Sequence, residues 1–419
     1  ATRSQKGYGG FRLSAMSETE NTGPLKGWKI IDLSRVLGGP YCTQLLGDLG
    51  AEVIKIEPPQ GDETRDWGPP FDDQGEAAYF MGVNRNKKSV ALDIRAPEGR
   101  EILLRLLADA DALVENFKTG SLEKWGLGYE DVLKARFPRL IHCRVTGFGG
   151  DGPLGGFPGY DAVLQAMCGW FSVNGPPDGT GVRVGIPLVD IGTGLFAANA
   201  ILAAAVEREK SGMGQLVEAS LFDTGIAFQH PHAPNWFLSG KAPQRVGNAH
   251  TNIAPYDAFP SATVDIYLSV GNNGQFRRLC EALGAPEMVG DPRYANNSDR
   301  VKNKPALRDA LVKLLADKDG EALCMTLLQQ GVPAGPILDM AGILNHPHTK
   351  HREMVVEKDG YRGIGVPIKF SRTPGTVRSR PPTFGENDRD VLSAAGFSKD
   401  EITRFVEAGV VLEQRRKAT

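Results

Sequence analysis

The sequence lacks several features that would assign it at once to a class of protein. Its 419 residues include five cysteines, scattered and without a CxxC pair, which argues against a disulfide framework or a cysteine-rich zinc site and favours a reducing compartment. Neither sign of charge dominates, since 48 Lys and Arg face 50 Asp and Glu, so no nucleic-acid partner is expected. The longest apolar run, 194–206, is shorter than the roughly 20 residues that span a bilayer, and no membrane partner is expected either.

Familiar cofactor and metal motifs are also missing. The first predicted βα turn, 36–42, lacks G-x-G-x-x-G, and the chain has no G-x-x-x-x-G-K-[ST], so neither a dinucleotide site nor a P-loop is predicted. Three histidines lie close together at 346–351, but Pro347 interrupts any helical face there, which favours a solvated loop. We expect no metal and no permanently bound cofactor.

The first half of the chain alternates short apolar runs with helical segments. Strands are predicted at 28–33, 51–57, 89–94, 112–117 and 140–148. Helices are predicted at 40–49, 97–110, 160–170 and 192–210, the last two after a glycine-rich break at 147–159. This alternation predicts an α/β fold, with a Rossmann-like large domain whose mostly parallel sheet is covered on both faces.

The second half has a different pattern, which predicts a smaller α+β domain. It contains a long predicted loop at 230–255, a strand at 265–270, helices from Gln275 and Pro305, and a Pro-rich tail with a last helix at 400–408. The expected domains are a large domain at 24–225, a small domain at 226–335 and a segment at 336–419 that returns to the large domain. Residues 1–23 are expected to be disordered, a tag or a transit remnant, and no secretory signal is predicted.

Two charged features allow more than one interpretation from the residues alone. The basic cluster 84–89, with Arg85, Lys87 and Lys88, is either a solvated turn or a phosphate site. Asp190 ends an apolar run before a long helix, which is typical of an N-cap. A helix N-terminus also keeps a carboxylate ionised, as a nucleophile must be, so both roles stay open.

Seven segments, found together in one order, resemble the class III CoA-transferases over nearly the whole chain from about Pro24. They are RVLGGPYCTQLLGDLGAEVIKIE, NRNKKSVALDI, ALVENFKTGSLEKWGLGYEDV, RVTGFGGDGP, GYDAVLQAMCG, VDIGTG and KSGMGQLVEASLFD. Within that family the chain is most similar to the succinyl-CoA:glutarate branch of dicarboxylate CoA-transferases, through WGPPF, GNAHTNIAPYDAF and VGNNGQF. The resemblance implies an interlocked homodimer in the cytoplasm, or in the mitochondrial matrix if the source is eukaryotic.

The resemblance also implies a mechanism in which Asp190 is the nucleophile. CoA moves from an acyl-CoA donor, such as succinyl-CoA, to a dicarboxylic acid through an aspartyl-CoA thioester. Lys118 and Lys124 would meet phosphates, Tyr160 would lie beside the thioester, and backbone N–H groups after Asp190 and around 248–250 would hold oxyanions. The implied CoA- and substrate-binding residues are Leu37, Leu92, Asp93, Ile94, Arg95, Asn116, Phe117, Lys118, Lys124, 157–160, Asn248, Ala249 and His250, with Arg245 as a candidate for a second carboxylate.

Departures from related patterns weigh against other activities. Formyl-CoA transferases have a Gln where this chain has Leu37, and a tetraglycine loop where it has 250–253. Acyl-CoA racemases of the family have a second acid/base His where this chain has Tyr160. An acyl-CoA racemase or isomerase, a formyl-CoA transferase and a non-catalytic acyl-CoA-binding protein remain the alternatives.

Overall fold

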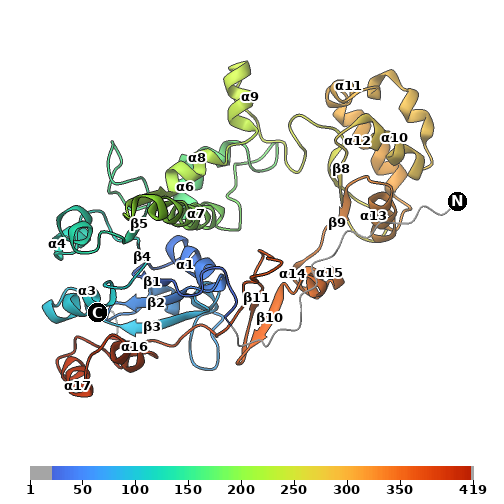
Figure 1. Cartoon of the computed structure of the whole chain (residues 1–419). Helices are drawn as coiled ribbons and strands as arrows, with labels where there is room; N and C mark the ends of the chain where they lie inside the picture. Colours follow the sequence, from blue (N-terminus) through green and yellow to red (C-terminus); the bar gives the residue numbers. More distant parts are fainter. Residues whose placement is uncertain (1–20, 417–419) are drawn as a thin grey trace. The chain divides into compact units, whose positions relative to one another are not determined.

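A computed structural model describes residues 21–416, which form two compact units. The large unit contains the described residues up to Cys168, together with 184–229 and those from His348 onward. The small unit contains 169–183 and 230–347, and so extends beyond the predicted limits of 226–335. The prediction for 1–23 lies outside the described residues except for 21–23. Figure 1 labels the elements along the chain.

The large unit is built on a six-stranded sheet in which every neighbouring pair of strands is parallel. The strand order is β3-β2-β1-β4-β5-β6. The strands are β1 (Lys29–Asp32), β2 (Glu52–Glu57), β3 (Lys87–Ala91), β4 (Ala112–Glu115), β5 (Ile141–Thr146) and β6 (Leu216–Ser220). The predicted α/β fold with a parallel sheet is confirmed. β6 was not predicted because this edge strand is partly exposed and lacks an apolar run.

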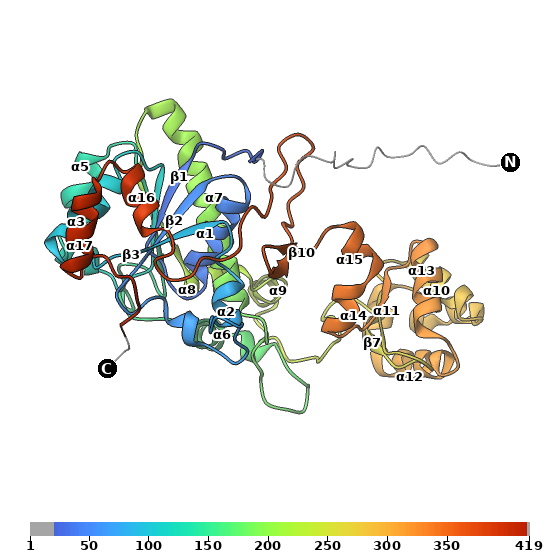
Figure 2. The ribbon, with the colours of Figure 1, turned by 90° about the horizontal axis from the view of Figure 1, so that it is seen from below.

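Helices cover both faces of this sheet (Figure 2). On one face α1 (Gly38–Asp48) packs against α7 (Leu188–Ser211), which also contacts β5 and β6. The other face is covered by α3 (Pro97–Leu106), α16 (Asp388–Ala394) and α17 (Lys399–Glu407). α7 ends where Gly212 takes a φ of 78°, a left-handed conformation that costs glycine little. These layers leave the ends of the strands open for a site.

α7 is the one helix of the described chain that is long and apolar enough to cross a membrane. Half of its apolar window is buried inside the protein, against α1 and the sheet. An apolar core helix of an α/β protein has the same composition, because both of its sides pack against protein.

The C-terminal segment lies against β3 at the edge of the sheet. The N–H of Ala91 donates to Asp388 Oδ1 at 2.8 Å, and the N–H of Ser89 donates to Asn387 Oδ1 at 3.0 Å. A further antiparallel bridge joins Leu92 to Val411. Residues 387–411 therefore cover the edge that a β3 strand would otherwise expose.

The small unit has its own antiparallel sheet and its own apolar core. The sheet consists of β7 (Tyr256–Phe259), β8 (Ile266–Ser269) and β9 (Ala334–Pro336). Its helices are α9 (His232–Ser239), α10 (Asn273–Ala282), α11 (Asn297–Lys302), α12 (Lys304–Leu315), α13 (Gly320–Gln329) and α14 (Met340–Asn345). The predicted loop at 230–255 is wrong where α9 forms, since Pro234 falls in the first turn of that helix, where no N–H is needed.

The remaining elements are short. They are α2 (Ala78–Met81), α4 (Ser121–Lys124), α5 (Lys134–Arg136), α6 (Asp161–Met167), α8 (Leu221–Ala227), α15 (Pro347–His351), β10 (Val355–Lys358) and β11 (Tyr361–Ile364). The loop expected at 346–351 is wrong from Pro347 onward, where α15 begins, because proline is tolerated at a first helical position. Within residues 21–416, no three His, Cys, Asp or Glu side chains are grouped as metal ligands would be.

Candidate active site

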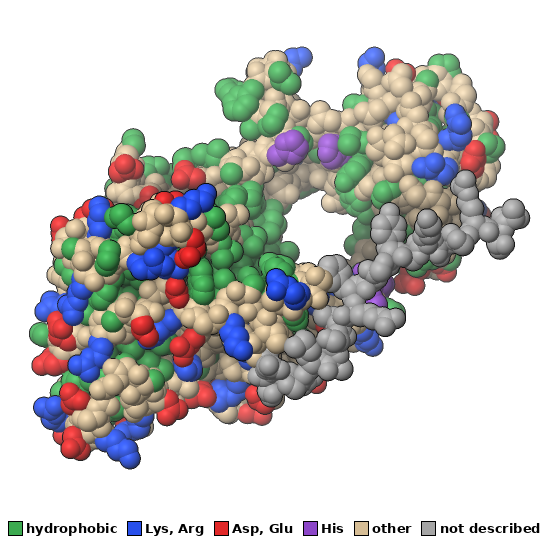
Figure 3. Space-filling view, in the orientation of Figure 1, with side chains coloured by type: hydrophobic (Ala, Val, Ile, Leu, Met, Phe, Trp, Pro, Cys, Tyr) green, Lys and Arg blue, Asp and Glu red, His purple; other side chains and the backbone are tan. Residues whose placement is uncertain are grey.

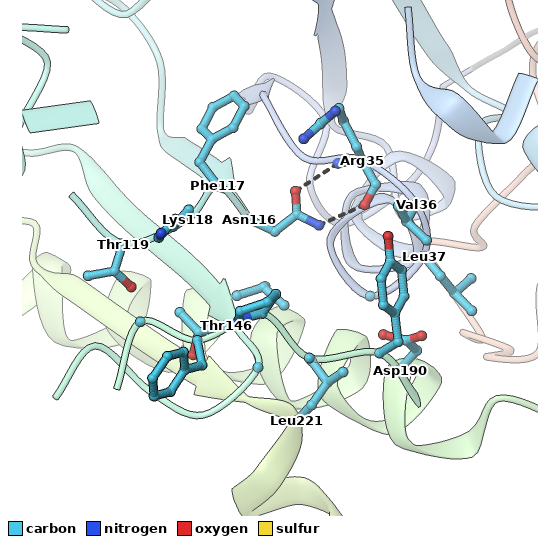
Figure 4. Close-up of a pocket in the computed structure, with 18 of the residues that line it drawn as sticks. Arg35, Val36, Leu37, Asn116, Phe117, Lys118, Thr119, Thr146, Asp190 and Leu221 are labelled. Carbon is cyan, nitrogen blue, oxygen red and sulfur yellow. Dashed lines mark hydrogen bonds between the residues drawn. The ribbon is translucent and has the colours of Figure 1, made fainter. Parts of the chain in front are cut away.

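A cavity of about 310 Å³ opens at the carboxyl ends of the strands of the large unit. β1 lies between β2 and β4, so the order of strands reverses between β1 and β4, and α/β proteins bind ligands at such a switch point. The lining comes from the segments that follow these strands, 35–38 after β1 and 116–119 after β4, together with 156–160 and Asp190. Figure 4 shows Asp190 and Lys118 toward opposite sides of this cavity.

A second cavity of about 300 Å³ continues from the first. It runs along 92–95, and it shares Arg35, Phe117 and Lys118 with the first cavity. We call the two cavities together the groove. Most predicted binding residues of the large unit line it: Leu37, Leu92, Asp93, Ile94, Arg95, Asn116, Phe117, Lys118 and 157–160. Lys124, at the end of α4, is exposed and is not among the lining residues.

Asp190 is the third residue of α7 and does not cap it. The helix begins at Leu188, and its first amides are satisfied from α6, where Asp161 Oδ1 accepts the N–H of Val189 at 2.8 Å and that of Asp190 at 3.4 Å. The N-cap interpretation of Asp190 is therefore wrong. Because Asp161 fills that role, the carboxylate of Asp190 is left to line the groove.

The groove holds Asp190 in surroundings that favour its protonated form. Burial and, after it, the negative charge of Asp161 together raise the pKa of Asp190 to about 7. This shift is opposite in direction to the one expected from a helix N-terminus, because desolvation and the neighbouring charge both raise the pKa.

The backbone around Asp190 also differs from the expected oxyanion site. The N–H of Ile191 donates to the carbonyl of Pro187 at 3.0 Å, so the amide that follows Asp190 is used within α7. The prediction that this amide holds an oxyanion is wrong. Gly38, at the start of α1, approaches Asp190 closely: a Cβ there would lie 3.6 Å from Asp190 Oδ1. This glycine leaves open space beside the carboxylate.

Arg35 and Glu63 are groove residues that sequence reasoning missed. Arg35 Nη1 lies 3.0 Å from Glu63 Oε2, and its backbone is clamped by Asn116, which accepts the N–H of Arg35 at 2.9 Å and donates to its carbonyl at 2.7 Å (Figure 4). The position of Arg35 directly after a buried parallel strand is a signal that could have identified it. Glu63 follows no strand, and only the fold places it there.

The basic cluster at 84–89 does not form a phosphate site through Arg85 or Lys87. Arg85 is buried and makes an ion pair with Asp48 at 2.7 Å, while Lys87 is buried against Asp32 at 2.9 Å. Lys88 is exposed and lies 2.6 Å from Glu52. The phosphate interpretation is wrong for the first two, because internal carboxylates already neutralise them.

Four predicted site residues belong to the small unit. Arg245 donates to the carbonyl of Gly179 at 2.7 Å, Asn248 accepts at its carbonyl from Tyr267 Oη at 2.6 Å, and His250 Nδ1 accepts the N–H of Asn252 at 3.0 Å. Ala249 lines a separate apolar cavity of about 260 Å³. Their part in substrate binding stays a prediction.

Comparison with known proteins identifies the family to which this chain is similar. The sequence model of CoA-transferase family III matches residues 25–388. The succinate–glutarate CoA-transferase of Agrobacterium fabrum is 40% identical over 381 residues, which are 88% of this chain and 95% of that protein. The acetyl-CoA:oxalate CoA-transferase of Acetobacter aceti is 41% identical over 351 residues, 83% of this chain and 90% of that protein.

A solved structure agrees with this assignment. The crystal structure of a CAIB/BAIF family protein from Brucella suis has 42% sequence identity and a TM-score of 0.81, and covers 89% of this chain and 100% of that one. The fold and its relatives thus define an enzyme that transfers CoA. The chain belongs to CoA-transferase family III, and the resemblance seen in the sequence is confirmed.

Proposed function

We propose that this CoA-transferase moves CoA from succinyl-CoA, or a similar acyl-CoA, to a dicarboxylic acid, with Asp190 as the nucleophile. The observation that carries the proposal is a partly buried carboxylate lining a groove at the switch point of the sheet. Relatives named for glutarate and for oxalate support a dicarboxylate acceptor. The cytoplasm or the mitochondrial matrix remains the proposed location.

The groove suits an extended CoA thioester. Its outer part, along 92–95, would flank the adenine, and the Lys118 ammonium would neutralise phosphate oxygens. Tyr160 and Asp190 line the other cavity together, which would bring the thioester to the carboxylate. The two cavities share Phe117 and Lys118, which supports a ligand that extends from one cavity into the other.

Transfer then proceeds by carboxylate chemistry. Asp190 attacks the thioester carbonyl, the C–S bond breaks, and a mixed anhydride and CoA thiolate form. The thiolate attacks the aspartyl carbonyl, which releases the donor acid and leaves an aspartyl-CoA thioester. The acceptor carboxylate attacks this thioester, and the released thiolate then attacks the new acyl group and frees Asp190.

The start of α1 is suited to hold the oxyanions of these steps. Gly38 and Gly39 open the helix, so their N–H groups have no partner within it. Gly38 lies beside Asp190, as its nearest contacts show. Fixed donors at this place would stabilise the charge that develops on the attacked carbonyl.

A homodimer, interlocked as the resemblance implies, belongs to the same proposal. Hydrophobic side chains project from the end of α9 (Figure 3). Phe237 is 75% exposed and Leu238 is 91% exposed, and the ring of Trp236 lies 5.6 Å from that of Phe237. Such a cluster is unusual on a monomer surface and fits a subunit contact.

The acceptor specificity provides the test of this function. We expect kcat/KM with succinyl-CoA to be at least about 10-fold higher for glutarate than for butyrate, because a charged partner for the second carboxylate contributes about 1.5–3 kcal/mol. Coupled assays would compare these acids with oxalate. Equal use of butyrate and glutarate would contradict a dicarboxylate acceptor.

The same assays test the residues proposed for the second carboxylate. Arg245→Ala and His250→Ala should lower the ratio of kcat/KM for glutarate to kcat/KM for butyrate. Arg293 is an exposed arginine of the small unit that pairs with Asp291, and Arg293→Ala should leave this ratio unchanged. If neither variant narrows the preference, the function stands and only this assignment fails.

The pH dependence of acylation follows from the pKa of Asp190. Because the nucleophile is the carboxylate and its pKa is raised to about 7, the rate of acyl-enzyme formation should rise with pH and level off above about pH 8. Trapping with hydroxylamine at pH 5–9 measures this rate. A rate independent of pH over that range would show that Asp190 is already ionised at pH 5.

A further inference from the structure

The carboxylate of Asp161 is fixed beside the proposed nucleophile by contacts on both of its oxygens. It is the first residue of α6, and its residue is 7% exposed. Oδ1 accepts the N–H groups of Val189 and Asp190, and Oδ2 accepts from Gln165 Nε2 at 2.7 Å. Each oxygen therefore has a defined partner, and the carboxylate has a single orientation.

Gln165 is itself held by hydrogen bonds, so the network that orients Asp161 extends to the backbone of Val184. It is fully buried, and its Oε1 accepts the N–H of Val184 at 2.8 Å while its Nε2 also faces the carbonyl of the same residue at 3.3 Å. The link from Val184 through Gln165 and Asp161 to the start of α7 thus consists of buried polar groups that satisfy one another.

No basic side chain makes an ion pair with Asp161 among the ion pairs of the described residues, a property that it shares with the buried Asp388 but not with four other buried carboxylates near the sheet. Asp32, Asp48, Glu57 and Asp62 each pair with a buried Lys or Arg. The charge of Asp161 therefore acts on its neighbour without a counter-ion between them.

The ionisable groups around Asp190 are few. Tyr79 of α2 faces it, but burial, followed by the charge of Asp190, raises the pKa of Tyr79 to about 12, so this phenol is neutral at working pH. The other elements packed against α7 carry further ionisable residues: Tyr41, Cys42 and Asp48 on α1, His142, Cys143 and Arg144 on β5, Glu218 on β6 and Asp223 on α8. Within the described chain, Asp161 is the charged group that raises the pKa of Asp190.

We propose that Asp161 is a positioning residue for the transfer reaction, which holds the first turn of α7 and whose negative charge favours acylation of Asp190. The inference rests on the proposed function, because it takes Asp190 to be the nucleophile. Acylation converts the Asp190 carboxylate into a neutral ester-like group, and so removes the repulsion between two neighbouring carboxylates. Asp161 thereby raises the free energy of the resting enzyme relative to the anhydride and thioester intermediates.

The test is Asp161→Asn, which removes the charge and keeps an oxygen that accepts the N–H of Val189. Acylation by succinyl-CoA is followed from pH 5 to 9 by hydroxylamine trapping at Asp190. We call the rise of the acylation rate with pH the acid limb. In the variant the midpoint of this limb should lie at least about half a pH unit lower, because one of the two causes of the raised pKa of Asp190 is gone. Its plateau rate should fall about 3- to 10-fold, because the relief of repulsion is lost.

Two further variants make the result specific to charge. Asp161→Glu keeps the charge and should keep the acid limb of the wild type. Asp388→Asn is the matched control: Asp388 is also buried, also accepts a backbone N–H and also has a pKa raised to about 7, mainly by burial, but it does not line the groove. This control should change neither the limb nor the plateau.

The outcomes separate the inference from the function on which it rests. If wild type is not labelled at Asp190, the proposed function fails. If wild type is labelled but Asp161→Asn keeps the wild-type acid limb, the inference fails, and a loss of rate alone would mean that Asp161 is only structural. Asp161→Ser, a second neutral variant with an acceptor oxygen, replaces the Asn variant if that protein does not fold.

Discussion

Replacement of Asp190 by Ala is expected to lower CoA transfer by at least about 1,000-fold, because the neighbouring carboxylate of Asp161 has hydrogen bonds on both oxygens and does not line the groove, so it cannot form the covalent intermediate instead. Binding of CoA should change little, since the remaining groove residues are untouched. Steady-state assays and calorimetric titration with CoA measure the two effects. In wild type incubated with acyl-CoA and hydroxylamine, mass spectrometry should find the modification at Asp190. A label on another carboxylate, or an active Ala variant, would contradict the assignment.

Replacement of Asp190 should lower activity but raise the stability of the fold. Burial and the charge of Asp161 raise the pKa of Asp190 from 3.8 to about 7, so ionisation of Asp190 opposes folding. This cost in free energy grows as pH rises from 3.8 to 7 and is complete above 7. Asp190→Asn should therefore raise the free energy of unfolding by about 1–3 kcal/mol at pH 8, and by less at pH 5. Urea unfolding at both pH values measures the difference. A nucleophile that destabilises its own fold would account for both results.

Arg65→Ala is expected to destabilise the protein by about 3–5 kcal/mol, the usual cost of breaking a buried ion pair by removing one partner. Arg65 is completely buried, donates to both carboxylate oxygens of Glu57 at 2.8 and 2.6 Å, and lies 2.8 Å from Glu76. Its guanidinium also stacks 3.6 Å from the centre of the Phe80 ring. Without it, the buried Glu57 would lose its counter-charge.

Urea unfolding measures this loss, and an exposed arginine of the same unit serves as control. Arg389 pairs with Glu413 at the surface, where both side chains are more than 60% exposed, so Arg389→Ala should change stability by less than about 0.5 kcal/mol. A loss at Arg65 no larger than that at Arg389 would mean that Glu57 finds other partners or takes up a proton.

Buried ion pairs also fix the backbone of a turn that lines the groove. Lys55 pairs with Asp62 at 2.9 Å, and Asp62 Oδ1 accepts the N–H of Val36 at 3.3 Å, in the turn that lines the groove. Glu57 accepts the N–H of Asp62 at 3.1 Å, which connects this pair to Arg65. These buried ion pairs therefore also hold the backbone of the turn that lines the groove near Asp190.

Much of the large unit could be predicted from local sequence. The segments 28–33 and 51–57 are short and rich in Ile and Val, and each is followed or preceded by a helical segment, which is the pattern of a parallel sheet covered by helices. The observed strands Lys29–Asp32 and Glu52–Glu57 lie within these ranges. Asp190 itself was identified because seven short segments resemble one family and follow each other in that family's order. This comparison needs only the sequence and no knowledge of contacts.

Local sequence could not show how charges pair. Arg85 and Asp48 lie 37 positions apart, and Lys87 and Asp32 lie 55 apart, yet each pair meets in the core. From the sequence alone the cluster around Arg85 looked solvated or phosphate-binding, because charged residues are seldom buried unless a partner is present. The partner comes from another strand or helix, and only the fold brings it there.

The sequence by itself determined the parallel α/β architecture, the family and the position of the carboxylate, since each depends on patterns of neighbouring residues. The tertiary structure decided the state of that carboxylate. Asp161, 29 positions away, takes the helix amides that Asp190 was expected to cap and adds a like charge beside it. Desolvation and charge repulsion depend on distances through space. The aspartate that the sequence presents as an ionised helix cap is therefore, in the folded protein, a partly buried acid whose pKa is raised to about 7.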